Sequence, residues 1–171
     1  MIIEKELRKI NWLKIEIDEK IYKRLLLIGI VVMIAYLLIT FLSFAVPRIY
    51  HIDKNTVLDT EGTVKNGINH LYRGSLRLEL SGWAYKEGQD VQTFKSCYIL
   101  RNKETEKMYQ IRAHMKIMPE LQFVDGHQCL NCGIEAQSII LGLKNGVYDL
   151  YILYQNDHEN LLVDTGVEVD L

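Results

Sequence analysis

The residues with the clearest chemical potential form one short string, His127–Cys132, which holds two cysteines three positions apart. Cys129 and Cys132 could bind zinc from a single turn, with His127 or Cys97 completing the ligand set. Structural zinc sites usually need a second paired half-site, however, and the sequence has no other CxxC and no HxxxH spacing. The sequence therefore predicts no metal site and no cofactor.

The same cysteines allow two further interpretations. In an oxidising compartment, a disulfide from Cys97 to Cys129 or Cys132 would tie a core strand to a long loop and stabilise the domain by about 3 kcal/mol. Alternatively, all three are small thiols without a covalent role. A reactive thiol needs a lowered pKa, and the neighbouring Asp125 opposes thiolate formation. We therefore expect no catalytic redox activity from this pair.

Aromatic side chains offer a different chemistry, the stacking of a ring on a sugar. Trp83 follows the alternating Leu78 and Leu80, and a tryptophan in that setting is more often part of the core, which is the interpretation we favour. Three tyrosines in a later strand pose the same question. Tyr148 and Tyr154 share one face of that strand by parity and Tyr151 lies on the other, so they cannot form one platform.

Several enzyme classes find no support in the sequence. It contains no Walker loop, dinucleotide fingerprint, serine nucleophile elbow or HExxH motif. The net charge is −2, which gives no basic field for nucleic acid. We therefore expect a protein that is not an enzyme, and we name no catalytic residues.

An apolar run near the N-terminus determines where the rest of the chain lies relative to a membrane. From Leu25 to Val46, 22 residues carry no charged side chain. A helix of that length measures about 33 Å, enough for a hydrocarbon core of about 30 Å. The sequence thus predicts a transmembrane helix over 25–46. A cleaved signal peptide, suggested by the small residues Ser43 and Ala45, fits less well, because the run is long and follows a charged 24-residue tail.

The charges around this run predict its orientation. Residues 1–24 hold seven Lys/Arg and five Asp/Glu, whereas residues 47–171 hold thirteen and seventeen. Basic residues before a spanning helix keep that side in the cytoplasm. We therefore expect residues 1–24 to form a cytoplasmic juxtamembrane tail and the C-terminal domain to be extracytoplasmic. The tail has apolar residues at helical spacing, although its stretch 13–18 also alternates like a strand.

Beyond Pro47 the periodicity changes to alternation. Residues 47–70 suggest an extended linker with one short strand at 56–58, and residues 71–171 predict further strands, with an irregular stretch over 114–132. Six or seven short strands can bury one core, so the predicted fold is mainly β: a small antiparallel, immunoglobulin-like β-sandwich after one transmembrane helix. The predicted strands of the domain are Leu76–Ala84, Phe94–Leu100, Met108–Ala113, Ile134–Ile139, Val147–Tyr154 and Leu161–Val169.

Several short motifs resemble a known family. The string Leu78–Tyr85 contains the step Gly82-Trp83-Ala84, and later Gly133–Ala136 precedes the turn Leu143–Tyr148. These motifs resemble the small extracytoplasmic β-sandwich domains of Gram-positive membrane proteins associated with surface polysaccharide and glycan assembly. Ile134 stands where that family usually has an aromatic residue, and Arg112-Ala113-His114 departs from its Arg-Asp-Val step.

The anchor, the compact β domain and the missing catalytic motifs together predict a function. We expect a single-pass accessory protein of the bacterial cell envelope that binds a partner protein or a surface glycan through its sandwich. The alternative is a redox or metal-binding module that uses Cys129 and Cys132.

Overall fold

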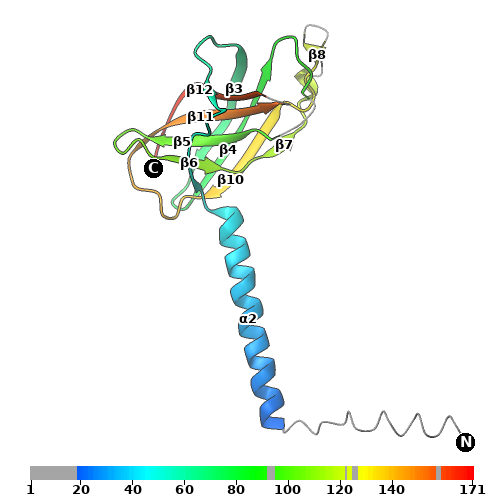
Figure 1. Ribbon diagram of the computed structural model, residues 1–171, viewed down its shortest axis with the longest axis vertical. Coiled ribbons are helices and arrows are strands. Elements are labelled where there is room, and N and C mark those ends of the chain that lie inside the picture. Colours follow the sequence, from blue (N-terminus) through cyan, green and yellow to red (C-terminus); the bar gives the residue numbers. More distant parts are fainter. Residues whose placement is uncertain (1–18, 92–94, 122, 125–126, 157–158) are drawn as a thin grey trace, which may run out of the picture. The chain divides into compact units, whose positions relative to one another are not determined.

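The computed structural model describes residues 19–91, 95–121, 123–124, 127–156 and 159–171 (Figure 1). The chain divides into two compact units, residues 1–42 and residues 43–171. The described part of the first is helical, and the second is built mainly from two larger β-sheets. The mainly β fold with one apolar N-terminal helix is therefore confirmed.

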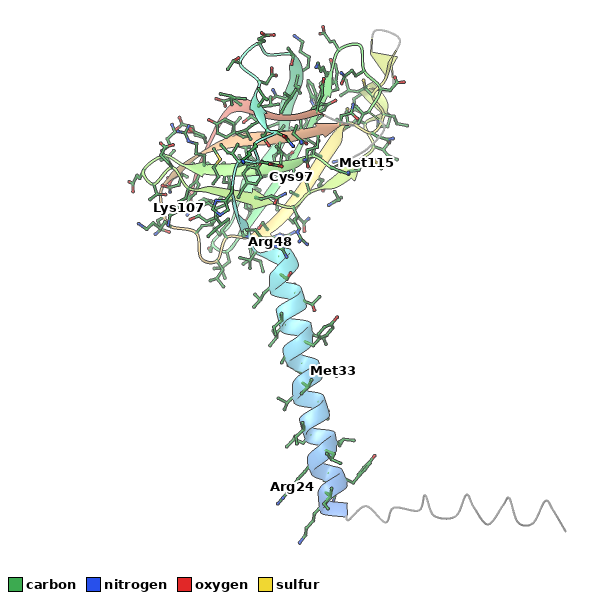
Figure 2. All side chains as sticks on the ribbon, in the orientation of Figure 1. Arg24, Met33, Arg48, Cys97, Lys107 and Met115 are labelled. Atoms are coloured by element: carbon green, nitrogen blue, oxygen red, sulfur yellow. The ribbon has the colours of Figure 1, made fainter. Side chains whose placement is uncertain are left out.

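The helix α2 runs from Glu19 to Ala45. Its segment Lys20–Ser43 has a mean hydropathy of 3.0, and none of that segment is buried inside the protein (Figure 2). The helix is long and apolar enough to cross a membrane. It begins six residues before the predicted segment and ends one residue early, because a residue that precedes proline disfavours helical geometry. The predicted tail structure over residues 1–18 lies outside the described residues.

The larger sheet has six strands, and their spatial order differs from their order along the chain. Its pairs are antiparallel except for the last, in which β12 and β2 run parallel. In spatial order the strands are β1 (Arg48–Tyr50), β6 (Met108–Ile111), β5 (Cys97–Asn102), β11 (Val147–Asn156), β12 (Glu159–Asp170) and β2 (Val57–Leu58).

The smaller sheet has four antiparallel strands, β3 (Val64–Arg73), β4 (Arg77–Lys86), β10 (Gly133–Ile139) and β7 (His114–Lys116). A 3-10 turn η2 (Pro119–Leu121) and a separate strand pair, β8 (Phe123–Val124) with β9 (His127–Gln128), follow β7. The stretch 114–132, predicted to be irregular, therefore contains three short strands as well as loops. Strands of two or three residues are too short to show alternation in a sequence.

The core lies between the two sheets. Alternate residues of β4, such as Leu78 and Leu80, are 1% exposed and pack against residues of the six-stranded sheet, such as Tyr98 and Leu150. The period of two in these strands thus gives each sheet one buried and one outward face. The arrangement is the predicted two-sheet sandwich.

The predicted linker over residues 47–70 is only partly correct. It holds β1, β2 and the first seven residues of β3, and so contributes to both sheets. Only the short strand near 56–58 was expected. β3 escaped detection because it is an edge strand with polar residues on both faces, and a bulge between Ile68 and His70 breaks its alternation.

Candidate functional site

The outward face of the four-stranded sheet carries two adjacent aromatic rings. Trp83 and Tyr85 point the same way from β4, and their ring centroids are 5.5 Å apart at an interplanar angle of 23°. Both side chains are half-buried, so each exposes part of its surface. Trp83 therefore does not belong to the core between the sheets, in contrast to the favoured interpretation of the sequence.

A glycine on the neighbouring strand allows the indole ring to lie against the sheet. Gly67 of β3 is the direct cross-strand partner of Trp83. A Cβ atom added to Gly67 would lie 2.8 Å from ring carbons of Trp83, closer than atoms can pack. On the other side of β4, the partner of Trp83 is Gly133. A Cβ atom on Gly133 would meet the Lys116 carbonyl oxygen and Met118 rather than the indole, so the ring lies in the gap that Gly67 alone leaves.

Polar side chains form the next rows of the same face. Ser81 pairs in register with His70 of β3 and with Glu135 of β10, and Glu135 pairs with His114 of β7. The Glu135 carboxylate also lies 3.7 Å from the Lys116 ammonium. We call this surface the aromatic face: the two rings of Trp83 and Tyr85 together with the polar row beside them. An apolar plate next to carboxylate, amine and imidazole groups can stack on a sugar ring and bind its hydroxyl groups.

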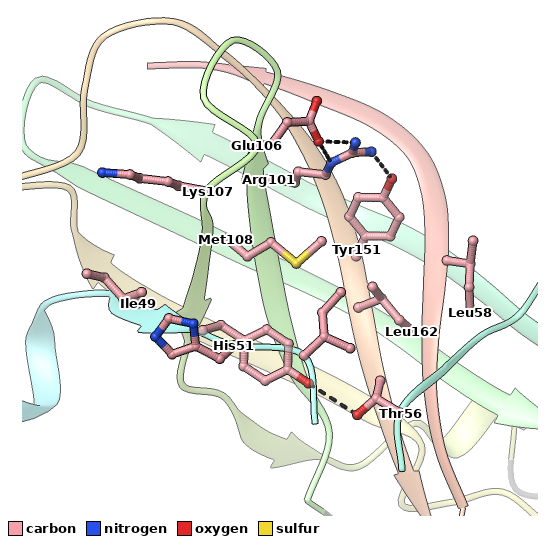
Figure 3. Close-up of a pocket in the computed structure, with 12 residues that line it drawn as sticks. Ile49, His51, Thr56, Leu58, Arg101, Glu106, Lys107, Met108, Tyr151 and Leu162 are labelled. Atoms are coloured by element: carbon pink, nitrogen blue, oxygen red, sulfur yellow. Dashed lines mark hydrogen bonds and ion pairs between the residues drawn. The ribbon is translucent and has the colours of Figure 1, made fainter. Parts of the chain in front are cut away.

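The outward face of the six-stranded sheet carries a pocket of about 960 Å³ (Figure 3). One wall is the segment from β1 to β2, and the floor consists of side chains from β5, β6, β11 and β12. Apolar side chains predominate, and Arg101, Glu106 and Lys107 bring charge to the rim. The lining comprises Ile49, Tyr50, His51, Ile52, Thr56, Leu58, Arg101, Glu106, Lys107, Met108, Tyr151 and Leu162.

No family model matches the chain, and no curated protein or solved structure matches it either. The functional argument therefore depends on the geometry of these two faces and of the cysteines.

The cysteines occupy two separate places. Cys97 lies in a small apolar cluster on the outward side of the six-stranded sheet, with Ile99 and Leu153. Cys129 and Cys132 lie in another cluster, against which Trp83 packs. None of the three forms a disulfide in the structure. The candidate link from Cys97 to either partner would have to join two different clusters, so the geometry does not favour it.

Burial favours the protonated form of Cys97 and Cys132. It raises the pKa of Cys97 to about 11, although a hydrogen bond from Gln110 Nε2 to Cys97 Sγ at 3.1 Å partly offsets the shift. Burial, and then the neighbouring Cys129, raise the pKa of Cys132 to about 12. Nucleophilic attack and metal binding both require the thiolate. Among the described residues, no three His, Cys, Asp or Glu side chains are grouped to hold a metal ion.

The three tyrosines of β11 follow the predicted parity. Tyr148 and Tyr154 are 0% and 1% exposed in the core, and Tyr151 points to the opposite face. Tyr151 lines the pocket, a role that the sequence did not indicate. Tyr85 was also missed, although its parity with Trp83 was visible in the sequence.

Proposed function

We propose that this chain is a single-pass accessory protein of the bacterial cell envelope, not an enzyme, whose extracytoplasmic sandwich binds a surface glycan through the aromatic face. One observation carries the proposal: Trp83 and Tyr85 stack side by side on the outward face of the smaller sheet, where they pack against a small buried cluster but stay partly exposed. The apolar helix supports the membrane anchor. The basic residues before the helix support the orientation.

The polar row beside the rings supports a glycan over an apolar ligand. Stacking satisfies only the C–H face of a sugar, and its hydroxyl groups need acceptors and donors. Glu135 and Lys116 supply both kinds of group next to Gly133 and Trp83. Gln137 continues the same face one row further and is exposed. A partner protein remains the second ligand class for the same sandwich.

The test is binding of the full-length chain in detergent to immobilised surface polysaccharide from the source cells. Trp83→Ala and Tyr85→Ala should each weaken binding at least several-fold. Gly67→Ala should act in the same direction, because the added methyl group displaces the indole ring. Gln137→Ala should weaken binding without a change in melting temperature, since this side chain is exposed and outside the core.

Leu76→Ala is the matched control, because Leu76 is 63% exposed and precedes β4, outside the aromatic face. Unchanged glycan binding in folded Trp83→Ala and Gln137→Ala variants would rule out this face as the glycan site. In that case, co-purification from detergent-solubilised membranes would show whether a partner protein occupies it instead.

The redox or metal-binding alternative at Cys129 and Cys132 gains no support from the geometry. Both side chains are 1% exposed, and the thiol of Cys132 has a raised pKa. A redox centre needs a thiol that is accessible and easily deprotonated. The double replacement Cys129→Ser with Cys132→Ser provides the test. Loss of function in a double variant that still folds and reaches the membrane would restore this alternative.

A further inference from the structure

The pocket on the six-stranded sheet results from an unusual connection. β1 and β2 follow each other in the chain but lie at opposite edges of the sheet, with four strands between them. Residues 51–56, which we call the crossing segment, must therefore pass over the outward face of that sheet. Figure 3 shows His51 and Thr56 of this segment along one side of the pocket that Met108, Tyr151 and Leu162 also line. A hydrogen-bonding contact between the Tyr50 and Thr56 hydroxyl oxygens, 3.4 Å apart, joins its two ends.

The crossing segment does not pack closely against the sheet, and a pocket lies between them. A pocket of about 960 Å³ is large enough for a small molecule or a hydrocarbon chain. The strands and crossing segment that bound it expose large aliphatic side chains: Ile49 is 64%, Ile52 is 55% and Leu58 is 50% exposed. Exposed apolar groups around an apolar pocket favour an apolar ligand, because its burial removes further hydrocarbon surface from water.

The charged groups Arg101, Glu106 and Lys107 come from the hairpin of β5 and β6, which borders the pocket. The Arg101 guanidinium is hydrogen-bonded to the Glu106 carboxylate and lies 3.5 Å from the Tyr151 hydroxyl (Figure 3). Lys107 is a second, exposed cation on the rim. Arg101 and Lys107 are two cations beside one carboxylate, Glu106, so the rim carries a net positive charge. The pocket thus combines an apolar interior with a cationic rim.

The chain places this pocket within reach of the bilayer. Ile49 follows Ala45, the last residue of α2, by four residues, so the two Cα atoms can be at most about 14 Å apart. Within the second unit, Ser138 Oγ donates a hydrogen bond to the Ala45 carbonyl at 3.0 Å. If α2 crosses a membrane, the crossing segment begins at the depth of the lipid head groups.

We propose that the pocket binds an anionic lipid of the surrounding membrane, with an acyl chain under the crossing segment and the head group at Arg101 and Lys107. The apolar lining takes the hydrocarbon, and the cationic rim selects the negative head group. The proposal requires that α2 lies in a membrane, but it is independent of glycan binding, which involves the opposite sheet.

The experiment uses the full-length chain in nanodiscs of phosphatidylcholine and phosphatidylglycerol in equal parts. In one preparation phosphatidylglycerol carries a photoactivatable acyl chain, and in the other phosphatidylcholine carries it. Peptide mass spectrometry then locates the crosslinks. We expect crosslinks on the crossing segment and around Met108, several-fold stronger from phosphatidylglycerol. Crosslinks on α2 should appear in both preparations and serve as the internal reference.

Two variants separate the acyl site from the head-group site. Met108→Glu places a charge in the apolar lining and should abolish pocket crosslinks while those on α2 persist. Arg101→Gln should reduce the phosphatidylglycerol signal to the phosphatidylcholine level. Met115→Glu is the matched control, because Met115 lies on β7 of the other sheet and is 43% exposed (Figure 2). If Met108→Glu fails to fold, Ile52→Glu tests the same lining from an exposed position.

Three outcomes would overturn the proposal. Crosslinks confined to α2 would mean that no lipid enters the pocket. Pocket crosslinks that persist in folded Met108→Glu and Ile52→Glu would mean that the acyl chain does not lie against the apolar lining. Equal labelling by the two lipids, unaffected by Arg101→Gln, would disprove the selection of a negative head group. Glycan binding should be unchanged in Met108→Glu, so failure of this proposal is distinguishable from failure of the glycan proposal.

Discussion

The environment of Trp83 determines how much its side chain contributes to the unfolding free energy. It packs against Gly67 and a small cluster with Met118, but it is only half-buried, whereas Leu80 on the same strand is 1% exposed in the core. We expect Trp83→Ala to cost about 1–3 kcal/mol and Leu80→Ala about 2–5 kcal/mol of unfolding free energy. Denaturant unfolding of both variants checks this, and a larger loss for Trp83→Ala would place the indole in the core after all.

The side of the sheet on which Trp83 lies could have been predicted. Leu78 and Leu80 occupy even positions of an alternating strand, so residue 83 must face the opposite way unless a bulge intervenes. The sequence interpretation relied on residue type instead of parity. The clearance above Gly67 could not have been predicted, because it depends on the register between two strands.

The buried thiols give a prediction about reactivity and pH. Because the pKa values of Cys97 and Cys132 are about 11 and about 12, both remain protonated at pH 8 in the folded protein. A thiol-reactive disulfide reagent at pH 8 should therefore modify the native chain slowly and all three cysteines quickly in denaturant. Fast modification of native Cys129 or Cys132 would contradict this and favour the redox alternative.

The same shifts determine how stability depends on pH at the alkaline end. A folded pKa above the unfolded value of about 8.5 means that the folded state holds its proton more tightly. The unfolding free energy should then fall as pH rises from about 8.5, by up to about 1.4 kcal/mol per pH unit for each thiol. Replacement of Cys97 by Ala should make this decline shallower, as measured by denaturant unfolding at several pH values.

At the scale of elements, the turn from β2 to β3 is the first of several connections along the chain between the two main sheets. The Asp59 carboxylate accepts hydrogen bonds from the backbone N–H groups of Thr63 and Val64, at 3.0 and 2.9 Å, and from the Thr63 hydroxyl. Its own N–H bonds to the Leu162 carbonyl at 3.0 Å. One acidic side chain thus organises the entry into β3.

We expect Asp59→Ala to lower the unfolding free energy by about 1 kcal/mol at pH 7, the value of charged hydrogen bonds reduced for solvent screening. Partial burial raises the pKa of Asp59, but the bonds from Val64 and Thr63 outweigh it and lower the pKa overall. The stabilisation is therefore present above about pH 4 and lost as pH falls through the folded pKa. In urea unfolding, the difference in unfolding free energy between Asp59→Ala and wild type should be smaller at pH 3 than at pH 7. Asp53→Ala, in the exposed crossing segment, is the control and should have little effect at either pH.

Long elements with clear periodicity could be predicted, and the connections between them could not. Composition identifies the apolar helix, and alternation identifies β4, β10 and β11. The pocket depends on β1 pairing with β6 at one edge and β2 pairing with β12 at the other. Strands of two or three residues carry almost no local signal, so these pairings, and the crossing segment they create, become visible only in three dimensions.

For the whole molecule, the basic residues before α2 predict that the sandwich lies outside the cytoplasm. Protease added to intact spheroplasts should digest the sandwich and leave the N-terminal tail protected, as detected with tags at each end. Lysed spheroplasts provide the control in which both ends become accessible. Protection of the sandwich in intact cells would reverse the orientation and remove the basis for an envelope function.

The cleaved signal peptide remains the structural rival of the anchor, and the mass of the mature chain decides between them. Cleavage after Ala45 would release residues 46–171, whose N-terminus precedes β1 by two residues. The Ala45 carbonyl, which accepts a hydrogen bond from Ser138, would then be missing from the mature chain. In an uncleaved chain, Ile49 of the pocket lining follows the last residue of α2 by only four residues. We therefore expect mass spectrometry of the membrane fraction to find the residues on both sides of Ala45 in one uncleaved chain, whereas a soluble product beginning at Val46 would remove both the anchor and the source of the proposed lipid.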